Sequence, residues 1–353
     1  MKSRLSKYQR QIALKSFGIQ NQEKLFASRV LIIGMGGLGI PVSQYLNAMG
    51  VGTLGLMDQD TIAIHNLQRQ VLYSEQEVGQ LKVEVASKKL QQQNSDTKIK
   101  AIPEFLTRDN ALGHMASYDL VVDASDNFAT RYLVNDACVL TQTPFVYGAL
   151  HDFEGQVSVF NHKGGPTYRC LFPNPPGASE IPNCDENGVL GVLPGIIGNL
   201  QALEAIKVLT GVGEPLSGKL LLFNGLTQEN RLVQFKAIPE NQMIQYLEER
   251  YETPDCSINL EIDVADFMAL PEHPQLFDVR SAEEFRGHHL EHAMNIPLPE
   301  LESQLDRLDL TRPLYFICQS GKRSRRAAET LSRRYPSALI YSISGGMNEI
   351  MAL

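Results

Sequence analysis

Glycines and an acidic residue near the N-terminus have the types and spacing of a nucleotide site. Four glycines lie where an apolar segment gives way to a helical pattern: Gly34, Gly36, Gly37 and Gly39. Glycine lets the backbone approach a phosphate closely, and the amide groups at the start of a helix attract its charge. Asp58 ends the next apolar segment, where an acidic residue can accept hydrogen bonds from ribose hydroxyls. This pattern predicts a bound nucleotide, but a dehydrogenase would share it, and glycines that serve only helix–strand packing are a further alternative.

Cationic, amide and carboxylate side chains that follow the glycines favour another chemistry. They are Asp60, Asn66, Arg69, Gln70, Lys82, Asp126 and Asn127. A hydride-transfer site has little use for them. A carboxylate that attacks an α-phosphate meets like-charge repulsion, so such a site needs Arg or Lys on the phosphates and Mg²⁺ held by a carboxylate. The set therefore predicts ATP and Mg²⁺, although surface ion pairs would also explain Arg69 and Lys82.

A second set of residues near the C-terminus could carry sulfur. Cys318 follows the apolar segment PLYFI and precedes the helical pattern RSRRAAETL, with a short turn between them: Gln319, Ser320, Gly321, Lys322 and Arg323. The amides of such a loop, the start of a helix and Arg323 would together stabilise a thiolate or a persulfide anion. The alternatives are an inert core cysteine and a cysteine-phosphatase loop, but the latter has one more residue between cysteine and arginine.

The elements that must position these residues alternate between strand and helix. The run RVLIIGMGGLGIPVSQYLNAMGVGTLGLMDQD predicts a strand, a glycine turn, a helix and a second strand. A helix at 78–93 and the strands KIKAIPEF and YDLVVDAS continue the alternation, which predicts a parallel sheet covered by helices. From Phe145 onward, short strands with turn residues predict antiparallel additions to the same sheet. The fold class is therefore α/β, with a Rossmann-like, doubly wound mixed sheet.

Length and composition indicate two domains in an ordinary globular protein of 353 residues. The first domain is expected at 1–236, a polar linker with two prolines at 237–259, and a smaller α/β domain at 260–353. The net charge of −8 argues against nucleic-acid and anionic-membrane partners. We find no apolar segment of signal-peptide or membrane-spanning length, and five scattered cysteines suit a reducing compartment, so we expect a cytoplasmic protein.

The first domain resembles the MoeB/ThiF branch of the ubiquitin-activating enzymes. RQ near the N-terminus, GMGGLG, D-x-D, NLQRQ, GQxK, DxxDN and GVLGVLPGIIG occur in the order of that family and cover nearly the whole domain. The resemblance implies adenylation of the C-terminal glycine of a ubiquitin-like sulfur carrier ending in Gly-Gly, with loss of pyrophosphate, after which sulfur replaces AMP. It also assigns Asp58 to the ribose, Arg69 and Lys82 to the triphosphate and Asp126 to Mg²⁺.

The same resemblance gives Arg10 a role across a subunit interface. In this family an arginine at this place, in the segment YQRQ, reaches into the nucleotide site of the neighbouring subunit. A homodimer is therefore implied. A solvated charge on a helix is the alternative interpretation of Arg10.

The last domain resembles a rhodanese. The interval from Cys318 to Arg323, the upstream run DVRSAEEFRGHHLEHAMNIP and the SGG at 344–346 are similar to that family over almost the whole domain. The resemblance implies a Cys318 persulfide as the sulfur source. Gln319 is a departure, because rhodaneses joined to these enzymes commonly have arginine there, so the charge that aids anionic donors is reduced. Both thiosulfate and a cysteine desulfurase therefore stay open as donors.

Three other cysteines bear on the chemistry. Cys184 lies in NPPGASEIPNCDENG, where related proteins place a cysteine near the adenylate, so it is a candidate acyl acceptor or disulfide partner of Cys318, or a harmless loop residue. Relatives bind a structural zinc through two C-x-x-C pairs. Here the first pair reads TYRC with only Cys170, and the nearest counterpart of the second reads CSIN with only Cys256, so we predict that structural zinc is absent.

Three hypotheses follow from the sequence. The leading one is an adenylyltransferase and sulfurtransferase that charges a sulfur carrier. The others are an NAD-dependent oxidoreductase with a rhodanese accessory, and a scaffold without catalysis. The sequence leaves open whether the carrier serves molybdopterin, thiamine or tRNA thiolation.

Overall fold

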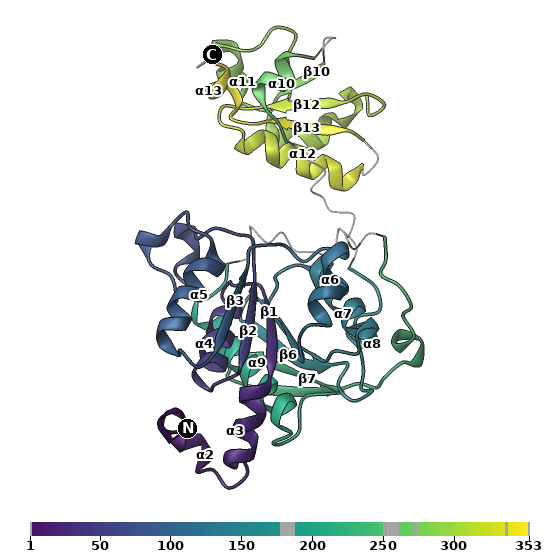
Figure 1. Cartoon of the computed structure of the whole chain (residues 1–353). Coiled ribbons are helices and arrows are strands. Elements are labelled where there is room, and N and C mark those ends of the chain that lie inside the picture. The colour runs from purple at the N-terminus through teal and green to yellow at the C-terminus, as the bar shows by residue number, and fades with distance from the viewer. Residues whose placement is uncertain are drawn as a thin grey trace. The chain divides into compact units, whose positions relative to one another are not determined.

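The structure, a computed structural model, describes residues 2–176, 188–249, 251, 261–270, 274–335 and 338–351. The chain forms two compact units (Figure 1). We call the N-terminal one unit 1 and the C-terminal one unit 2. Each is described by itself.

Unit 1 is built on one mixed sheet. Its eight strands within the described residues are β1 (Arg29–Ile33), β2 (Thr53–Met57), β3 (Lys98–Ile102), β4 (Leu120–Asp123), β5 (Phe145–His151), β6 (Glu154–Phe160), β7 (Lys219–Asn224) and β8 (Asn230–Gln234). The order across the sheet is β3-β2-β1-β4-β5-β6-β7-β8. Neighbours from β3 to β5 are parallel, and the pairs from β5 to β8 are antiparallel. The predicted parallel sheet with antiparallel additions is confirmed.

Helices cover both faces of this sheet (Figure 1). They are α1 (Lys2–Ser6), α2 (Gln9–Ile12), α3 (Gly18–Ala27), α4 (Gly39–Ala48), α5 (Lys82–Gln93), α6 (Arg108–Met115), α7 (Phe128–Leu140), α8 (Tyr168–Leu171) and α9 (Val192–Thr210). Alternate residues of β1 serve opposite cores. Val30 and Ile32 pack with α4, α5 and α9, whereas Leu31 and Ile33 pack with α6 and α7. A strand buried on both faces is apolar throughout, which explains the continuous run in the sequence.

Two helices of unit 1 differ from what the sequence pattern predicts. The helix expected from residue 78 begins at Lys82, because Ser74 and Glu77 form a capping box on a short 3₁₀ helix and Gly79 has a φ of 88°. Helix α9 has the length and apolar composition of a membrane-spanning segment, but half of it is buried within the unit. It packs on α4 and on strands β5 and β6 as a core helix.

The first part of the stretch expected to be a linker packs on unit 1. Leu247 is buried, and Glu248 forms an ion pair with Arg169. The Tyr251 hydroxyl donates to Asp136 at 2.9 Å. Residues up to 251 therefore belong physically to unit 1, because buried contacts and not only chain connectivity hold them there.

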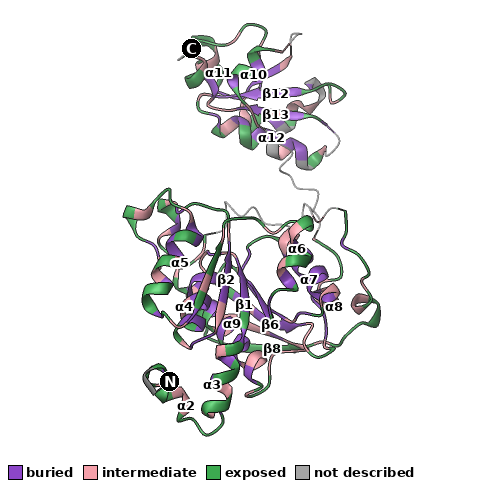
Figure 2. Cartoon of the chain, viewed as in Figure 1, coloured by how far each residue is buried: buried purple, intermediate pink, exposed green. Residues whose placement is uncertain are grey.

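Unit 2 is a small parallel α/β unit. Its strands are β9 (Glu261–Ile262), β10 (Gln275–Asp278), β11 (Met294–Asn295), β12 (Leu314–Ile317) and β13 (Ile340–Ile343), in the order β11-β10-β12-β13-β9. Its helices are α10 (Val264–Met268), α11 (Ala282–Gly287), α12 (Lys322–Arg334) and α13 (Gly346–Ile350). Buried residues concentrate along β12 and β13 in Figure 2. Cys318 follows β12 directly, so the packed sheet fixes its position.

Candidate functional site

The glycine turn after β1 lies at the carboxyl edge of the sheet, closely packed against the end of β4 and against α9. Gly34 has a φ of 94°, and a Cβ there would lie 2.7 Å from the carbonyl oxygen of Ala124. Only glycine fits this backbone and this approach to the end of β4. A Cβ on Gly37 would lie 2.9 Å from Pro194 of α9 and 3.6 Å from the Arg69 side chain. The turn is thus closely packed against β4 and α9. Helix α4 begins directly after it, at Gly39.

Asp58 is anchored at the same edge, directly after β2. Its Oδ2 accepts a hydrogen bond from the Met35 amide at 2.7 Å, and its Oδ1 accepts one from the Asp60 amide at 2.8 Å. Burial raises the pKa of this carboxyl, while Lys82 and the two amides lower it. Each carboxylate oxygen can accept a second hydrogen bond. Asp58 is therefore held in place with acceptor capacity left for ribose hydroxyls.

Lys82 is a buried cation at the first residue of α5. Its Nζ lies 2.7 Å from Asp60 Oδ2, and only 5% of the lysine side chain is exposed against 54% of the aspartate side chain. The Tyr73 hydroxyl lies 3.0 Å from the Met35 carbonyl oxygen and 3.3 Å from that of Lys82, so it ties the glycine turn to α5. Tyr73 was not predicted from the sequence, because a tyrosine among apolar residues is indistinguishable there from an ordinary core residue.

Arg69 and Gln70 face the glycine turn with unused bonding capacity. The Arg69 guanidinium donates to Asn66 Oδ1 at 3.0 Å and to the His65 carbonyl at 3.3 Å, and it has no carboxylate partner in the described part of the chain. Gln70 is buried, its Nε2 lies 3.6 Å from where a Cβ on Gly36 would sit, and its Oε1 has no hydrogen-bond partner among the described residues. An unpaired guanidinium and a buried unpaired acceptor together suit an anionic ligand with polar groups.

Asp126 lies exposed beyond β4. Within the described residues its side chain accepts one long hydrogen bond, 3.5 Å from Asn127 Nδ2 to Asp126 Oδ1. Asn127 caps α7, because its Oδ1 accepts from the Thr130 amide at 2.8 Å. Asn127, expected to bind the cofactor, thus also caps a helix. The Asp126 oxygens are left available for a cation.

A buried polar cluster below Asp126 was missed from the sequence. Asp123 is fully buried, and its Oδ1 accepts from the Ser125 amide and hydroxyl at 3.0 and 2.6 Å. Burial raises the pKa of Asp123, against the opposing charge of Arg131. Asp123 Oδ2 and Arg131 Nε lack hydrogen-bond partners among the described residues. The cluster supports the Asp126 loop, and the motif DASDN contains its first member.

Arg10 lies apart from the other predicted site residues of its own chain. It is exposed on α2, next to Tyr8, whose buried ring packs on Gly50 and Phe26. Lys7 forms an ion pair with Asp96 at 3.0 Å. These contacts precede β2 and β3, so they anchor the N-terminal segment at the amino edge of the parallel strands. The glycine turn is at the carboxyl edge.

The cysteine loop of unit 2 surrounds a buried sulfur. Cys318 is 1% exposed, and its Sγ lies 3.5 Å from the Ser324 hydroxyl oxygen. Burial raises the pKa of the Cys318 thiol, but hydrogen bonds from the Ser324 hydroxyl and from the amides of Ser324, Ser320 and Arg323 outweigh burial and lower it. The N-terminus of α13 holds the loop from outside, because the Met347 amide donates to the Cys318 carbonyl at 2.9 Å. The loop therefore stabilises a thiolate.

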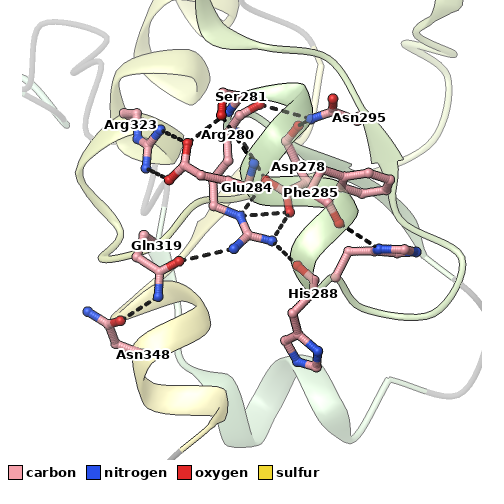
Figure 3. A network of polar contacts seen from close by, with 11 residues as sticks. Asp278, Arg280, Ser281, Glu284, Phe285, His288, Asn295, Gln319, Arg323 and Asn348 are labelled. Atoms are coloured by element: carbon pink, nitrogen blue, oxygen red, sulfur yellow. Dashed lines mark hydrogen bonds and ion pairs between the residues drawn. The ribbon is translucent and has the colours of Figure 1, made fainter.

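Charges around this loop are paired, as Figure 3 shows. Arg323 donates to both carboxylate oxygens of Glu284 at 2.7 Å, which lowers the pKa of Glu284 to about 2. Arg280 is buried and paired with Asp278 at 2.7 Å. Gln319 accepts from Arg280 at 3.0 Å. Within the loop, Lys322 is exposed and appears in no ion pair of the described residues.

Gln319 also reaches α13. Its Nε2 donates to Asn348 Oδ1 at 2.6 Å, on the side away from Arg280 (Figure 3). The side chain is therefore fixed at both ends. The position that departs from the rhodanese pattern thus holds a neutral side chain fixed between Arg280, which follows β10, and Asn348 of α13. An arginine there would add a positive charge.

Cys170 contacts polar groups from two segments of unit 1. Cys170 Sγ lies 3.3 Å from the Thr167 hydroxyl and 3.2 Å from the Ile238 amide, and Asn241 Nδ2 lies 4.0 Å away. The segment beside Cys170 is thus 238–241, and Cys256 lies outside the described residues. No group of three or more His, Cys, Asp or Glu that could hold a metal occurs in the described ranges. A tetrahedral zinc site takes four such ligands.

Two other cysteines complete the account. Cys138 is a core residue of α7, fully buried, and burial raises the pKa of its thiol well above the ordinary value. Cys184 lies outside the described residues.

Comparison with known proteins decides the family. The profile of the ThiF family matches residues 8–244, and that of the rhodanese-like domain matches residues 263–353. The chain belongs to the ThiF family. It also carries a rhodanese-like domain. The two resemblances seen in the sequence are confirmed, and the dehydrogenase interpretation gains no support from the matched families.

Relatives and solved structures extend this ThiF-family assignment. The chain is 39% identical over 364 residues to the adenylyltransferase and sulfurtransferase MOCS3-1 of Zea mays, covering 93% of this chain and 77% of that protein. It is 49% identical over 243 residues to the sulfur carrier protein adenylyltransferase of Thermus thermophilus, covering 67% and 90%. Escherichia coli MccB with MccA-N7isoASN has a TM-score of 0.57 at 26% identity, over 63% of this chain and 68% of that one. Unit 1 therefore has the ThiF/MccB fold.

Proposed function

We propose that this ThiF-family protein uses ATP to adenylate the C-terminal glycine of a ubiquitin-like sulfur carrier and then transfers sulfur to it from Cys318. The observation that carries the proposal is the arrangement at the carboxyl edge of unit 1. Anchored Asp58, buried Lys82, unpaired Arg69 and free Asp126 surround a glycine turn there. The names of the maize and Thermus relatives support the same activity.

In the adenylation step the side chains offset the charge of the phosphates. Asp58 accepts hydrogen bonds from the ribose, and Arg69 and Lys82 contact the triphosphate. Asp126 fits Mg²⁺, since the ion is usually bound through one or two carboxylates and the substrate phosphates. When bound, Mg²⁺ neutralises charge at the α-phosphate. The carrier carboxylate then attacks that phosphate, and pyrophosphate leaves.

Lys82 must change partners for this to occur. In the structure its ammonium is paired with Asp60, which is largely exposed. An exposed carboxylate is readily solvated once released, so the exchange costs little on the aspartate side. The buried stem of Lys82 keeps its ammonium at the edge of the turn, and a phosphate replaces Asp60 as its partner.

In the sulfur step Cys318 accepts sulfur from a donor as a persulfide. The terminal persulfide sulfur attacks the acyl carbon of the adenylate, and AMP leaves. For release, the thiolate of Cys184, the candidate partner, attacks Cys318 Sγ, the sulfur–sulfur bond to the acyl group breaks, and the thiocarboxylate leaves. A Cys184–Cys318 disulfide forms in this step, and an external thiol reductant then returns both cysteines to thiols. Thiosulfate and a cysteine desulfurase are the donor candidates. Trapping of the carrier on Cys184, read by mass spectrometry, tests the acyl-acceptor alternative.

The assembly we propose is a cytoplasmic homodimer without nucleic-acid or membrane partners. Arg10 is exposed at the amino edge of its own sheet, which suits a role in the neighbouring subunit's site. Helix α9 exposes Val192, Ile196 and Leu203. Their spacing places them along one side of the helix. Such apolar exposure supports a subunit interface.

Pyrophosphate exchange tests the adenylation assignment. In the presence of the carrier, Asp126→Ala and Arg69→Ala should each abolish ATP–pyrophosphate exchange, because the attack loses its metal or its charge compensation. Cys318→Ala should keep full exchange and lose sulfur transfer, since the half-reactions reside in separate units. Near-normal exchange in both unit 1 variants would refute the assignment.

A further inference from the structure

Two buried hydroxyl groups extend from the Cys318 sulfur into unit 2. Ser324 lies in the first turn of α12, and its Oγ is 3.5 Å from Cys318 Sγ and 3.0 Å from the Gly321 carbonyl oxygen. Ser342 lies on β13, and its hydroxyl donates to Ser324 Oγ at 2.9 Å. Both serines are fully buried. None of the sequence motifs singles out either one.

We propose that Ser324 and Ser342 act as a positioning pair that turns a hydroxyl hydrogen onto Cys318 when its thiol ionises, and so prepares the thiolate that accepts sulfur. This inference rests on the proposed function, because only that function makes the Cys318 thiolate the acceptor of sulfur. The geometry itself belongs to unit 2 alone.

The hydrogen count shows how the pair operates. A serine hydroxyl has one hydrogen to donate and lone pairs to accept with. Ser342 donates to Ser324, so the hydrogen of Ser324 is free for either the Gly321 carbonyl or the Cys318 sulfur. A neutral thiol brings its own weak donor, whereas a thiolate only accepts. Ionisation of Cys318 therefore turns the Ser324 hydrogen from the carbonyl to the sulfur.

The turn leaves no buried acceptor unpaired. The Gly321 carbonyl also accepts from the Arg325 amide at 3.0 Å, so it keeps a hydrogen bond when Ser324 leaves it. Ser342 continues to donate to Ser324 in both states. An unpaired buried polar group would destabilise one of the two states, but the Gly321 carbonyl and the Ser324 hydroxyl keep a partner in both.

The arginines nearest the sulfur are already paired with carboxylates, so neutral donors contribute to stabilising the thiolate. Arg323 of α12 is paired with Glu284 of α11, and Arg280 is paired with Asp278 of β10. Arg325 of α12 is paired with Glu261 of β9 at 2.9 Å. Further charges near the loop in the described residues are the exposed Lys322 of α12 and Glu349 of α13, which lies against Gly345. Because both guanidinium groups already share their charge with carboxylates, hydroxyl and amide donors carry much of the stabilisation.

The Ser324–Ser342 pair affects the step in which Cys318 accepts sulfur from the donor. The Cys318 thiolate attacks the outer sulfur of a persulfide donor, the donor's sulfur–sulfur bond breaks, and the donor thiolate leaves with the electron pair. A new sulfur–sulfur bond forms on Cys318, and no external oxidant or reductant is needed. Cys318 Sγ becomes the uncharged inner sulfur, so the Ser324 hydrogen bond favours the state before transfer.

The test measures the pH dependence of Cys318 alkylation by iodoacetamide in the full-length protein, followed on the Cys318 peptide by mass spectrometry. Ser324→Ala should raise the apparent pKa by about one unit, the effect typical of one lost hydrogen bond to a charged group. Ser342→Ala should shift it in the same direction by less. Ser324→Thr, which keeps the hydroxyl, should restore the lower value.

Ser332→Ala is the matched control. Ser332 is also a buried serine of α12, but its hydroxyl has no hydrogen-bond partner among the described residues. Its replacement should leave the alkylation profile unchanged. An unchanged profile in Ser342→Ala and in folded Ser324→Ala would overturn the proposal, as would an equal shift in Ser332→Ala. Alkylation needs neither ATP nor carrier, so failure of carrier sulfuration with the expected shifts would count against the proposed function alone.

Discussion

Replacement of Lys82 by methionine removes the most deeply buried cation of the proposed ATP site while keeping most of its packing volume. The side chain is 5% exposed, so water replaces the lost ammonium poorly. Two unit charges about 4 Å apart interact by about 4 kcal/mol at the effective dielectric of a partly buried site. Loss of one charge-stabilising donor typically costs about 10²- to 10³-fold in rate. We therefore expect kcat/KM for pyrophosphate exchange to fall by about that factor in Lys82→Met.

The fold should survive this change. Asp60, the partner that remains, has a 54% exposed side chain and is solvated without Lys82. Lys89→Met is the matched control, because Lys89 lies on the same helix and also forms an ion pair, with Glu77 at 2.6 Å. Exchange should be measured at saturating carrier, with thermal unfolding as the test of folding. A Lys82→Met protein that is folded and retains exchange close to that of Lys89→Met would refute the phosphate-binding role.

Three further outcomes are expected. Mixing Arg10→Ala with Asp126→Ala subunits should recover exchange, because one site of the mixed dimer then holds both residues, and a mixture no more active than its parents would contradict the role in the partner's site. Gln319→Arg should raise the thiosulfate rate about fivefold at low salt, the effect of roughly 1 kcal/mol from one added charge, and less at high salt. No change would show that this position does not limit anionic donors. Elemental analysis without chelator should find far less than one zinc per chain, whereas about one per chain would show that other ligands complete a site.

Much of the fold was predictable because the core pattern is local. Residues 30–33 of β1 and 120–122 of β4 form continuous apolar runs because both faces of these strands are covered, and the glycine turn marks where the first strand ends. The start of α5 was misplaced because the capping box at Ser74 and the left-handed Gly79 end one short helix before the next begins. Such boundaries depend on particular hydrogen bonds that periodicity does not record.

The site was predictable where motifs are contiguous and not where the fold joins distant segments. Asp58 and Cys318 each lie in a contiguous sequence motif. Ser342 reaches Ser324 only because β13 pairs beside β12, and Ile238 reaches Cys170 across 68 positions of sequence. No local pattern reveals such pairs. The packing of residues up to 251 on unit 1 likewise depends on contacts with distant side chains.

The central claim is that one chain first activates a carrier's C-terminus with ATP and then delivers sulfur from Cys318. Intact mass spectrometry tests it most directly, with the full-length protein, MgATP, a persulfide donor and a small ubiquitin-like protein ending in Gly-Gly. The account predicts a carrier mass that corresponds to replacement of one oxygen by sulfur, with a strict need for ATP. With Cys318→Ala the carrier adenylate should form without sulfuration. Sulfuration that persists in Cys318→Ala, or that proceeds without ATP, would contradict the account.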